Sequence, residues 1–182
     1  MIKYLCPDEC PASLVDVDLD RLKQNGYRGI ILDLDNTLLP WAGDEIDQAV
    51  IGWVRRAKAA GFELCLTSNA LRSRVDRARQ ALGIPAIAGA IKPRKKPFRQ
   101  AMKVLGTEPT ETVVIGDQLF TDILGGNRMQ LYTILIDPMA SEEMAATKLI
   151  RRIERRIIRR LGRKGYISES AVRRRLASGG KR

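Results

Sequence analysis

Two aspartates, Asp33 and Asp35, follow directly after the apolar run GIIL, in the stretch DLDNTLLPW of residues 33–41. Aspartate is a poor strand former and is costly to bury, so a protein core has no use for it at this position. Two carboxylates at the end of a strand suit a reaction, because one can be a nucleophile and the other a general acid and base. The structural alternative is that these residues only cap a polar turn.

Polar side chains follow three further apolar runs of the chain. Ser68 and Asn69 follow the second run, Lys92 follows the third, and Asp117 ends the fourth. Ligands of open parallel sheets bind at the carboxyl ends of the strands. If these runs are parallel strands, all of these side chains meet at one edge of the sheet.

Such a set of groups suits phosphoryl transfer through an aspartyl-phosphate. Asp33 is predicted to attack, and Asp35 to protonate the leaving oxygen and then to take a proton from water. Asp117 is predicted to share a Mg²⁺ ion with Asp33, since hard carboxylate oxygens suit that ion. A hydroxyl, an amide and a cation are predicted to hold the remaining phosphoryl oxygens: Ser68, Asn69 and Lys92.

Three further assignments have alternatives. Asp122 is predicted to support the metal, although an exposed acid on a helix is ordinary. Thr37 is a candidate phosphate ligand that could instead cap the turn. Lys92 is preferred as the catalytic cation because a Lys-Pro step follows the third strand, and Lys96 is the reserve.

Composition narrows the chemistry and the compartment. The chain contains no histidine, which excludes Ser-His-Asp and Cys-His nucleophilic systems. The apolar fraction of 45% is ordinary for a globular protein. No run approaches the roughly 20 apolar residues of a membrane span, and the N-terminus lacks the long apolar stretch of a secretory signal. We therefore expect a cytoplasmic protein.

The apolar runs alternate with helical patterns, which predicts an α/β fold with a parallel sheet of about five strands covered on both faces. The expected strands are residues 29–34, 63–68, 86–90, 112–117 and 132–136. The expected helices are residues 45–60, 71–82, 96–105 and 119–129. The glycines of GGNR (125–128) are expected in a turn that ends the last of these helices.

Charge divides the chain into a near-neutral core, residues 1–141, and a basic part, residues 142–182. Residues 148–182 hold 14 Lys and Arg against two Glu, a net charge of +12, and the rest of the chain has a net charge of −1. Residues 142–162 form an amphipathic helical pattern. That helix could pack on the core, lie on the inner face of an anionic membrane, or contact RNA or the ribosome; the pattern weakens after Gly162.

The motifs resemble those of the haloacid dehalogenase-like (HAD) phosphatases. DLDNTLL is similar to their first motif, LTSN to the second, AIKP with Lys92 to the third, and GDQLFTD with Asp117 and Asp122 to the fourth. The resemblance implies a Rossmannoid three-layer core and Mg²⁺-dependent catalysis. It also implies that the backbone carbonyl of Asp35 binds the metal.

A narrower resemblance covers most of the chain and points to the YqeG-type proteins of HAD subfamily IIIA, which are related to phosphatidylglycerophosphate phosphatases. It rests on GIILDLDNTL, GAIKPRKKPF, VVIGDQLFTDILGGNR, YTILIDP and RRIERRI, together with PDE near the start. Two local departures are the absence of a doubled Asn after the second motif, in LTSNALRSR, and the presence of Pro97.

The spacing of the motifs predicts that the fold has no cap domain. Only 32 residues separate Asp35 from Ser68, and 23 separate Ser68 from Lys92. An open site admits a phosphate displayed on something large, and with the resemblance this predicts phosphatidylglycerophosphate as the substrate. The alternatives are a phosphatase of a soluble metabolite or phosphoprotein, and a ribosome- or RNA-associated protein with a vestigial site.

Overall fold

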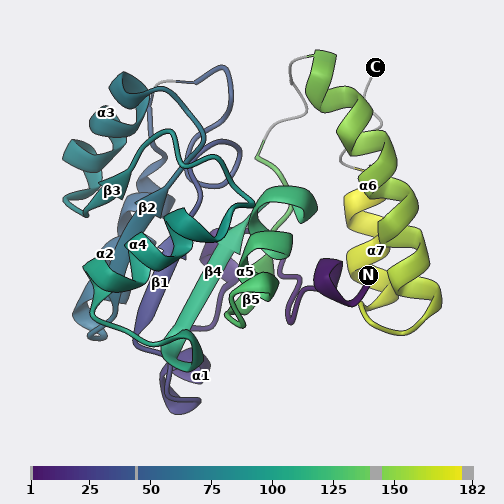
Figure 1. Ribbon diagram of the computed structural model, residues 1–182, viewed down its shortest axis with the longest axis horizontal. Coiled ribbons are helices and arrows are strands. Elements are labelled where there is room, and N and C mark those ends of the chain that lie inside the picture. The colour runs from purple at the N-terminus through teal and green to yellow at the C-terminus, as the bar shows by residue number, and fades with distance from the viewer. Residues whose placement is uncertain (1, 44, 140–144, 178–182) are drawn as a thin grey trace.

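The computed structural model describes residues 2–43, 45–139 and 145–177. Five parallel strands form one sheet in the order β3-β2-β1-β4-β5. The strands are β1 (Gly29–Leu32), β2 (Glu63–Thr67), β3 (Ala86–Ile87), β4 (Thr112–Gly116) and β5 (Tyr132–Leu135). Their carboxyl ends share the upper edge of the sheet in Figure 1, which we call the catalytic edge.

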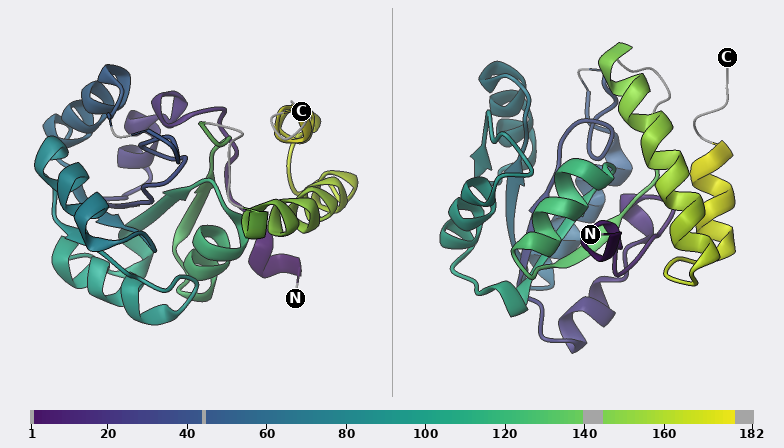
Figure 2. Two further views of the ribbon diagram at one scale, coloured as in Figure 1. Left: turned by 90° about the horizontal axis from the view of Figure 1, so that it is seen from above. Right: turned by 45° about the vertical axis from the view of Figure 1, so that its right-hand side comes forward.

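Helices cover both faces of this sheet, so the predicted three-layer α/β architecture is confirmed (Figures 1 and 2). One face carries α1 (Leu19–Gln24), α2 (Gln48–Ala59) and α3 (Arg72–Leu82), and the other carries α4 (Lys95–Leu105) and α5 (Leu124–Arg128). A short 3₁₀ turn, η3 (Pro109–Glu111), leads into β4.

The side chains of each central strand alternate between the two layers. Ile30 and Leu32 of β1 pack in one cluster with Trp53 of α2, whereas Ile31 packs in the other with Phe98 of α4. All four β1 residues are buried, because helices cover both sides of the strand. This is why the strand reads as a continuous apolar run, with its first polar side chain at Asp33.

The fourth predicted helix, residues 119–129, consists of two segments. A π-helical turn, η4 (Leu119–Ile123), leads into α5, and the glycines of GGNR lie inside α5 and not in a turn after it. A Cβ at Gly125 would lie 2.3 Å from Cε2 of Phe98, and one at Gly126 would lie 2.4 Å from Cγ1 of Val114. The two glycines therefore allow α5 to pack closely on α4 and β4.

Beyond β5 the chain forms a helical hairpin, α6 (Ala145–Arg163) and α7 (Glu169–Ala177), whose helices lie side by side (Figure 2). Ile158, Leu161 and Ile167 of this hairpin pack with Leu119 and Leu135 of the core. The sequence pattern did not predict α7. The proposed division at residues 141 and 142, and the first three residues of the helix expected at 142–162, lie outside the described residues.

The N-terminal segment covers the free edge of β5. It begins with η1 (Ile2–Leu5) and later forms η2 (Leu14–Asp16). Between them, the Asp8 amide donates to the Thr133 carbonyl at 2.9 Å, and the Leu135 amide donates to the Glu9 carbonyl at 2.9 Å. An exposed strand edge is a template for unwanted pairing, and these bonds remove it.

The two positions where a cap domain could be inserted hold only small elements. Within the described residues, α2 and its loops lie between Asp35 and Ser68, while α3 and β3 lie between Ser68 and Lys92. The catalytic edge therefore has no cap domain in this part of the chain. None of the described helices is both long and apolar enough to cross a bilayer.

The close packing of α5 predicts the effect of Gly125→Ala. The new methyl group would force Phe98 or α5 to move, so the free energy of unfolding should fall by about 1–3 kcal/mol in a denaturant titration. Gly52→Ala in α2 is the matched control, because nothing lies within 4 Å of its Cβ. That change should raise stability by about 0.5–1 kcal/mol; equal effects of the two changes would contradict the packing argument.

Candidate active site

Three buried carboxylates meet at the catalytic edge. Asp33 follows β1, Asp117 follows β4, and Asp122 lies in η4. One oxygen from each lies within 4.8 Å of the others. Leu32 of β1 pairs with Ile115 of β4, at the point where the strand order reverses, so the register itself brings the first two carboxylates together.

The side chain of Lys92 completes this acidic cluster. Its Nζ lies 2.5 Å from Oδ1 of Asp33 and 2.6 Å from Oδ1 of Asp122, whereas Lys96 is exposed. Burial alone would lower the pKa of Lys92, but the Asp122 and Asp33 carboxylates outweigh it and hold that pKa above its ordinary value. The ammonium group therefore stays charged inside the protein.

One ammonium group does not balance three carboxylates. Burial raises the pKa of Asp33 to about 8. The Lys92 ammonium opposes this rise, whereas the carboxylates of Asp122 and Asp117 reinforce it. Clustered carboxylate oxygens with excess negative charge are the donor set that a hard divalent cation prefers, so the residues present fit such an ion.

Asp35 lies outside this cluster and is held by an arginine of α3. Nε of Arg74 donates to Oδ1 of Asp35 at 2.8 Å. The same guanidinium donates to the carbonyls of Gly43 at 2.9 Å and Pro40 at 2.8 Å. Arg74 thus ties Asp35 to the loop that follows it, a role that the sequence did not suggest.

The three candidate phosphate ligands have different surroundings. Ser68 is buried, and its Oγ accepts from the Ala70 amide at 3.0 Å. Asn69 is exposed, and its Oδ1 accepts from the Lys92 amide at 2.8 Å, so it also positions the loop that carries the lysine. Thr37 is buried, and within the described residues its hydroxyl has no hydrogen-bond partner.

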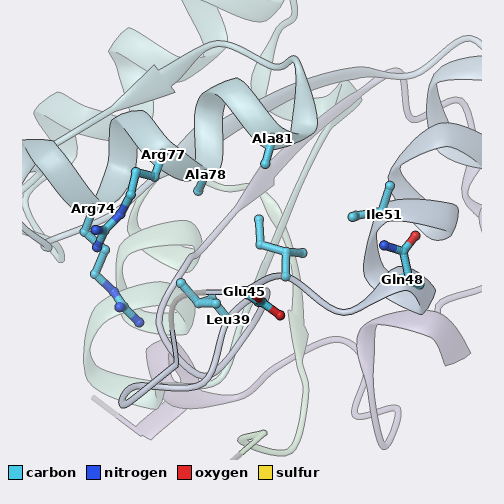
Figure 3. Close-up of a pocket in the computed structure, with 9 residues that line it drawn as sticks. Leu39, Glu45, Gln48, Ile51, Arg74, Arg77, Ala78 and Ala81 are labelled. Atoms are coloured by element: carbon cyan, nitrogen blue, oxygen red, sulfur yellow. The ribbon is translucent and has the colours of Figure 1, made fainter.

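A recess of about 310 Å³ lies between α2 and α3, beside the loop that Arg74 holds (Figure 3). Arg74 and Arg77 reach toward it from α3 at one end, and Ile51 of α2 lies at the other. Leu39 and Ala78 contribute apolar surface between them. Glu45 and Gln48 also line it, so the recess mixes charged, polar and apolar side chains, with the two arginines gathered at one end.

Two residues of the C-terminal hairpin brace the turn that carries Asp117. Arg175 of α7 donates from Nη2 to the Asp117 carbonyl at 2.8 Å and from Nη1 to the Ile136 carbonyl. Glu154 of α6 accepts from the Leu119 amide at 2.7 Å, at the start of η4. The sequence analysis identified neither residue. Glu154 lies four residues before Ile158, on the apolar stripe of an arginine-rich helix, and an acidic residue there could have indicated a buried polar contact.

Comparison with known proteins identifies the family. A family model described as HAD-hydrolase-like matches residues 90–152. The chain is 40% identical over 165 residues to the probable phosphatase YqeG of Bacillus subtilis, an alignment that covers 91% of this chain and 96% of that protein. The chain belongs to the YqeG-type phosphatases of the HAD superfamily. The family inferred from the sequence motifs is thereby confirmed.

This YqeG-type chain has two further informative relatives. It is 27% identical over 173 residues to phosphatidylglycerophosphate phosphatase 1, chloroplastic/mitochondrial, of Arabidopsis thaliana, which covers 90% of this chain and 50% of that protein. Its fold matches the magnesium-bound HAD-hydrolase YfnB of Bacillus subtilis with a TM-score of 0.52 at 14% identity, covering 60% of this chain and 86% of that one. The second likeness shows the shared fold.

The brace on the Asp117 turn predicts a large effect of Arg175→Met. The change leaves two buried carbonyls without this donor and removes one of the two arginines paired with Asp137, the one 3.5 Å from its Oδ1. Arg174 remains paired with Asp137 at 3.0 Å. Stability in a denaturant titration should fall by about 2–4 kcal/mol. Arg173→Met is the matched control in the same helix, because this side chain is 82% exposed and should change stability by no more than about 0.5 kcal/mol. An equally small loss for Arg175→Met would rule out the brace.

Proposed function

We propose that this chain is a Mg²⁺-dependent phosphomonoester hydrolase that acts through an aspartyl-phosphate and that its substrate is phosphatidylglycerophosphate. The observation that carries the chemistry is the buried cluster in which Lys92 lies between Asp33 and Asp122, with Asp117 beside them. The cytoplasmic location expected from the sequence is part of the same proposal.

In the first step, an oxygen of Asp33 attacks phosphorus and the bond to the leaving oxygen breaks. Asp35 gives its proton to that oxygen, so the product alcohol leaves neutral. Lys92 pairs with the negative charge that remains on the phosphoryl group, and Ser68 and Asn69 can donate to its other oxygens. The product of this step is an aspartyl-phosphate on Asp33.

In the second step, a water molecule attacks the phosphorus of the aspartyl-phosphate. Asp35, now ionised, takes a proton from that water, and the bond between phosphorus and the Asp33 oxygen breaks. Inorganic phosphate is released and both carboxyl groups return to their starting states. Arg74 holds Asp35 in place for both proton transfers.

Asp33, Asp117 and Asp122 would hold the magnesium ion, with the backbone carbonyl of Asp35 as a further ligand. The ion, when bound, neutralises negative charge that would otherwise keep the phosphate and the Asp33 carboxylate apart. The buried carboxylates and their clustered oxygens support this assignment.

Three observations support a lipid phosphate as the substrate. The Arabidopsis relative is a phosphatidylglycerophosphate phosphatase by name. In the described part of this chain no cap domain covers the catalytic edge, so a phosphate attached to a large object can approach it. Arg74 contacts Asp35 and also lines the recess between α2 and α3. The recess can therefore receive the group attached to the phosphate.

Replacing Asp33 with Asn tests the nucleophile. The amide keeps the shape of the side chain but cannot form the phosphoryl ester, so phosphate release from phosphatidylglycerophosphate in mixed micelles should fall at least about 1,000-fold. Asp20→Asn on α1, at the far side of the fold, is the matched control and should retain full activity. Omitting Mg²⁺ should abolish the wild-type activity.

The same assay discriminates between substrates. If the protein hydrolyses soluble phosphomonoesters or a phosphoprotein but not the lipid, its substrate is one of those compounds and not phosphatidylglycerophosphate. Wild-type protein that releases no phosphate from any of them, yet binds RNA with a steep salt dependence, would overturn the enzymatic proposal.

The pKa of Asp33 predicts a pH-dependent response to Mg²⁺. Protons and cations compete for carboxylates, and burial raises the pKa of Asp33, so protons compete for it at a higher pH than they do for an ordinary carboxyl group. Raising the pH from about 6 to about 9 should therefore strengthen apparent Mg²⁺ affinity by about tenfold or more, measured as the gain in Tm at each Mg²⁺ concentration. Asp33→Asn should flatten this pH dependence, and a response that is already flat in the wild type would contradict it.

A further inference from the structure

Large apolar side chains are exposed on the loops that follow four of the five strands at the catalytic edge. Among the described residues these side chains are Trp41 after β1, Leu71 after β2, Ile91 after β3 and Met139 after β5. Leu71 is 81% exposed and Ile91 is 59% exposed. Single exposed apolar residues are ordinary, but four on one edge around a buried site form a pattern that marks an interaction surface.

Hydrogen bonds join these loops in two pairs beside the site. The Lys92 amide donates to Oδ1 of Asn69 at 2.8 Å, which joins the loops after β3 and β2. The Met139 amide donates to the Asn36 carbonyl at 3.0 Å, which joins the loops after β5 and β1. These bonds hold the backbone of each pair of loops together beside the acidic cluster.

Ile91 carries two costs that the fold does not require. Its φ of +54° is the left-handed conformation, which a β-branched residue adopts only with strain. Its side chain nevertheless points into solvent, directly before Lys92. Asparagine or glycine would be easier to accommodate here, so the exposed isoleucine supports a contact from outside the chain.

Basic side chains accompany the apolar ones at the same edge. Arg72 begins α3, and Arg94, Lys95 and Lys96 form the cap and first turn of α4; all four are exposed. Neither helix has an acidic residue in its first turn. Cations at the positive end of a helix dipole are unfavourable by about 0.3–1 kcal/mol, so the three basic residues at the start of α4 oppose its stability and suit an anionic partner. Arg72 is partly compensated by an ion pair with Asp76 at 3.7 Å.

We propose that the rim of the site, defined by Trp41, Leu71, Ile91 and Met139 with Arg94, Lys95 and Lys96, is the surface through which the protein docks on an anionic phospholipid bilayer. The proposal rests on the proposed function and adds to it the face that meets the membrane. Apolar side chains interspersed with basic ones suit the interfacial zone of such a bilayer. There the apolar side chains insert between the lipids and the basic side chains contact the lipid phosphates.

The depth of the site favours a bilayer as the occupant. Asp33, Asp117 and Asp122 are all buried, and the rim stands around them. A phosphate that projects from a bilayer can reach these carboxylates only if the surrounding loops touch the lipid surface. Contact between the rim and the bilayer is thus a geometric requirement for hydrolysis of a lipid phosphate within the membrane.

A second basic surface competes for the same role. The outer face of α6 exposes arginines that include Arg156, Arg159, Arg160 and Arg163. This helix lies beyond β5, at the side of the sheet (Figures 1 and 2). Docking through that face would turn the catalytic edge aside from the bilayer, so the two surfaces predict different results for the same binding experiment.

The test uses the full chain bearing Asp33→Asn, so that docking is measured apart from hydrolysis. Co-sedimentation is measured with vesicles of phosphatidylcholine containing about a quarter phosphatidylglycerol, and with phosphatidylcholine alone. The rim variant is Leu71→Ser with Ile91→Asn. Serine is a favoured N-cap at position 71, where α3 starts, and asparagine tolerates the positive φ at position 91, so this variant should fold at least as well as its parent.

The rim variant should lose at least about tenfold in partitioning onto the anionic vesicles. Val104→Ser is the matched control, because Val104 is 52% exposed near the C-terminal end of α4, away from the rim, and it should leave binding unchanged. Lys95→Gln with Lys96→Gln should also weaken binding, whereas Arg159→Gln with Arg163→Gln on α6 should not.

Tryptophan fluorescence gives an independent readout. The chain has two tryptophans, of which Trp53 is fully buried and Trp41 is exposed on the rim. Binding to the anionic vesicles should shift the emission to shorter wavelength and allow brominated lipids to quench it, and Trp41→Phe should remove both effects.

Several outcomes overturn the docking surface. It fails if the rim variant binds like its parent, if only the α6 variant loses binding, or if the parent binds no anionic vesicles. Hydrolysis of phosphatidylglycerophosphate in micelles together with no vesicle binding would defeat the docking surface alone. If the rim variant loses vesicle binding but the wild type does not hydrolyse that lipid, the docking surface is supported and the proposed substrate is wrong.

Discussion

The ammonium group of Lys92 is the interaction on which the site depends. Three carboxylates cannot share a buried space at the end of a sheet without a cation between them, because each would raise the pKa of the others until they bound protons. Lys92 supplies one positive charge to Asp33 and Asp122. The negative charge that remains makes the same site attractive to a divalent cation, so the charge imbalance that is costly to the fold is useful to the chemistry.

Supports on opposite sides hold the two halves of this site. Arg74 ties Asp35 to the loop after β1, and Arg175 and Glu154 hold the turn after β4. Asp33 and Asp117 follow short strands at the middle of the sheet, where side chains are precisely placed, but the loops beyond need such partners to keep their positions. The arginine-rich hairpin therefore contributes structure to the site through its buried face, whatever its exposed arginines bind.

Much of the fold and of the candidate site could be predicted, because their signals are local. Runs such as GIIL mark strands that are buried on both faces, and Asp33, Lys92 and Asp117 stand where such strands or their loops end. The missed features depend on contacts between distant parts of the chain. Nothing near Arg74 shows that it reaches Asp35, and the glycines at 125 and 126 resemble a turn until Phe98 and Val114 are seen against them.

The contact between Arg175 and the Asp117 carbonyl links residues 58 positions apart. The five strands are all encoded before α6, so a chain emerging from the ribosome can build the sheet while the turn after β4 still lacks its guanidinium. The carboxylate environment then matures only after α7 has been synthesised and has docked. The turn that carries Asp117 thus receives its last support from a helix that follows all five strands in the sequence.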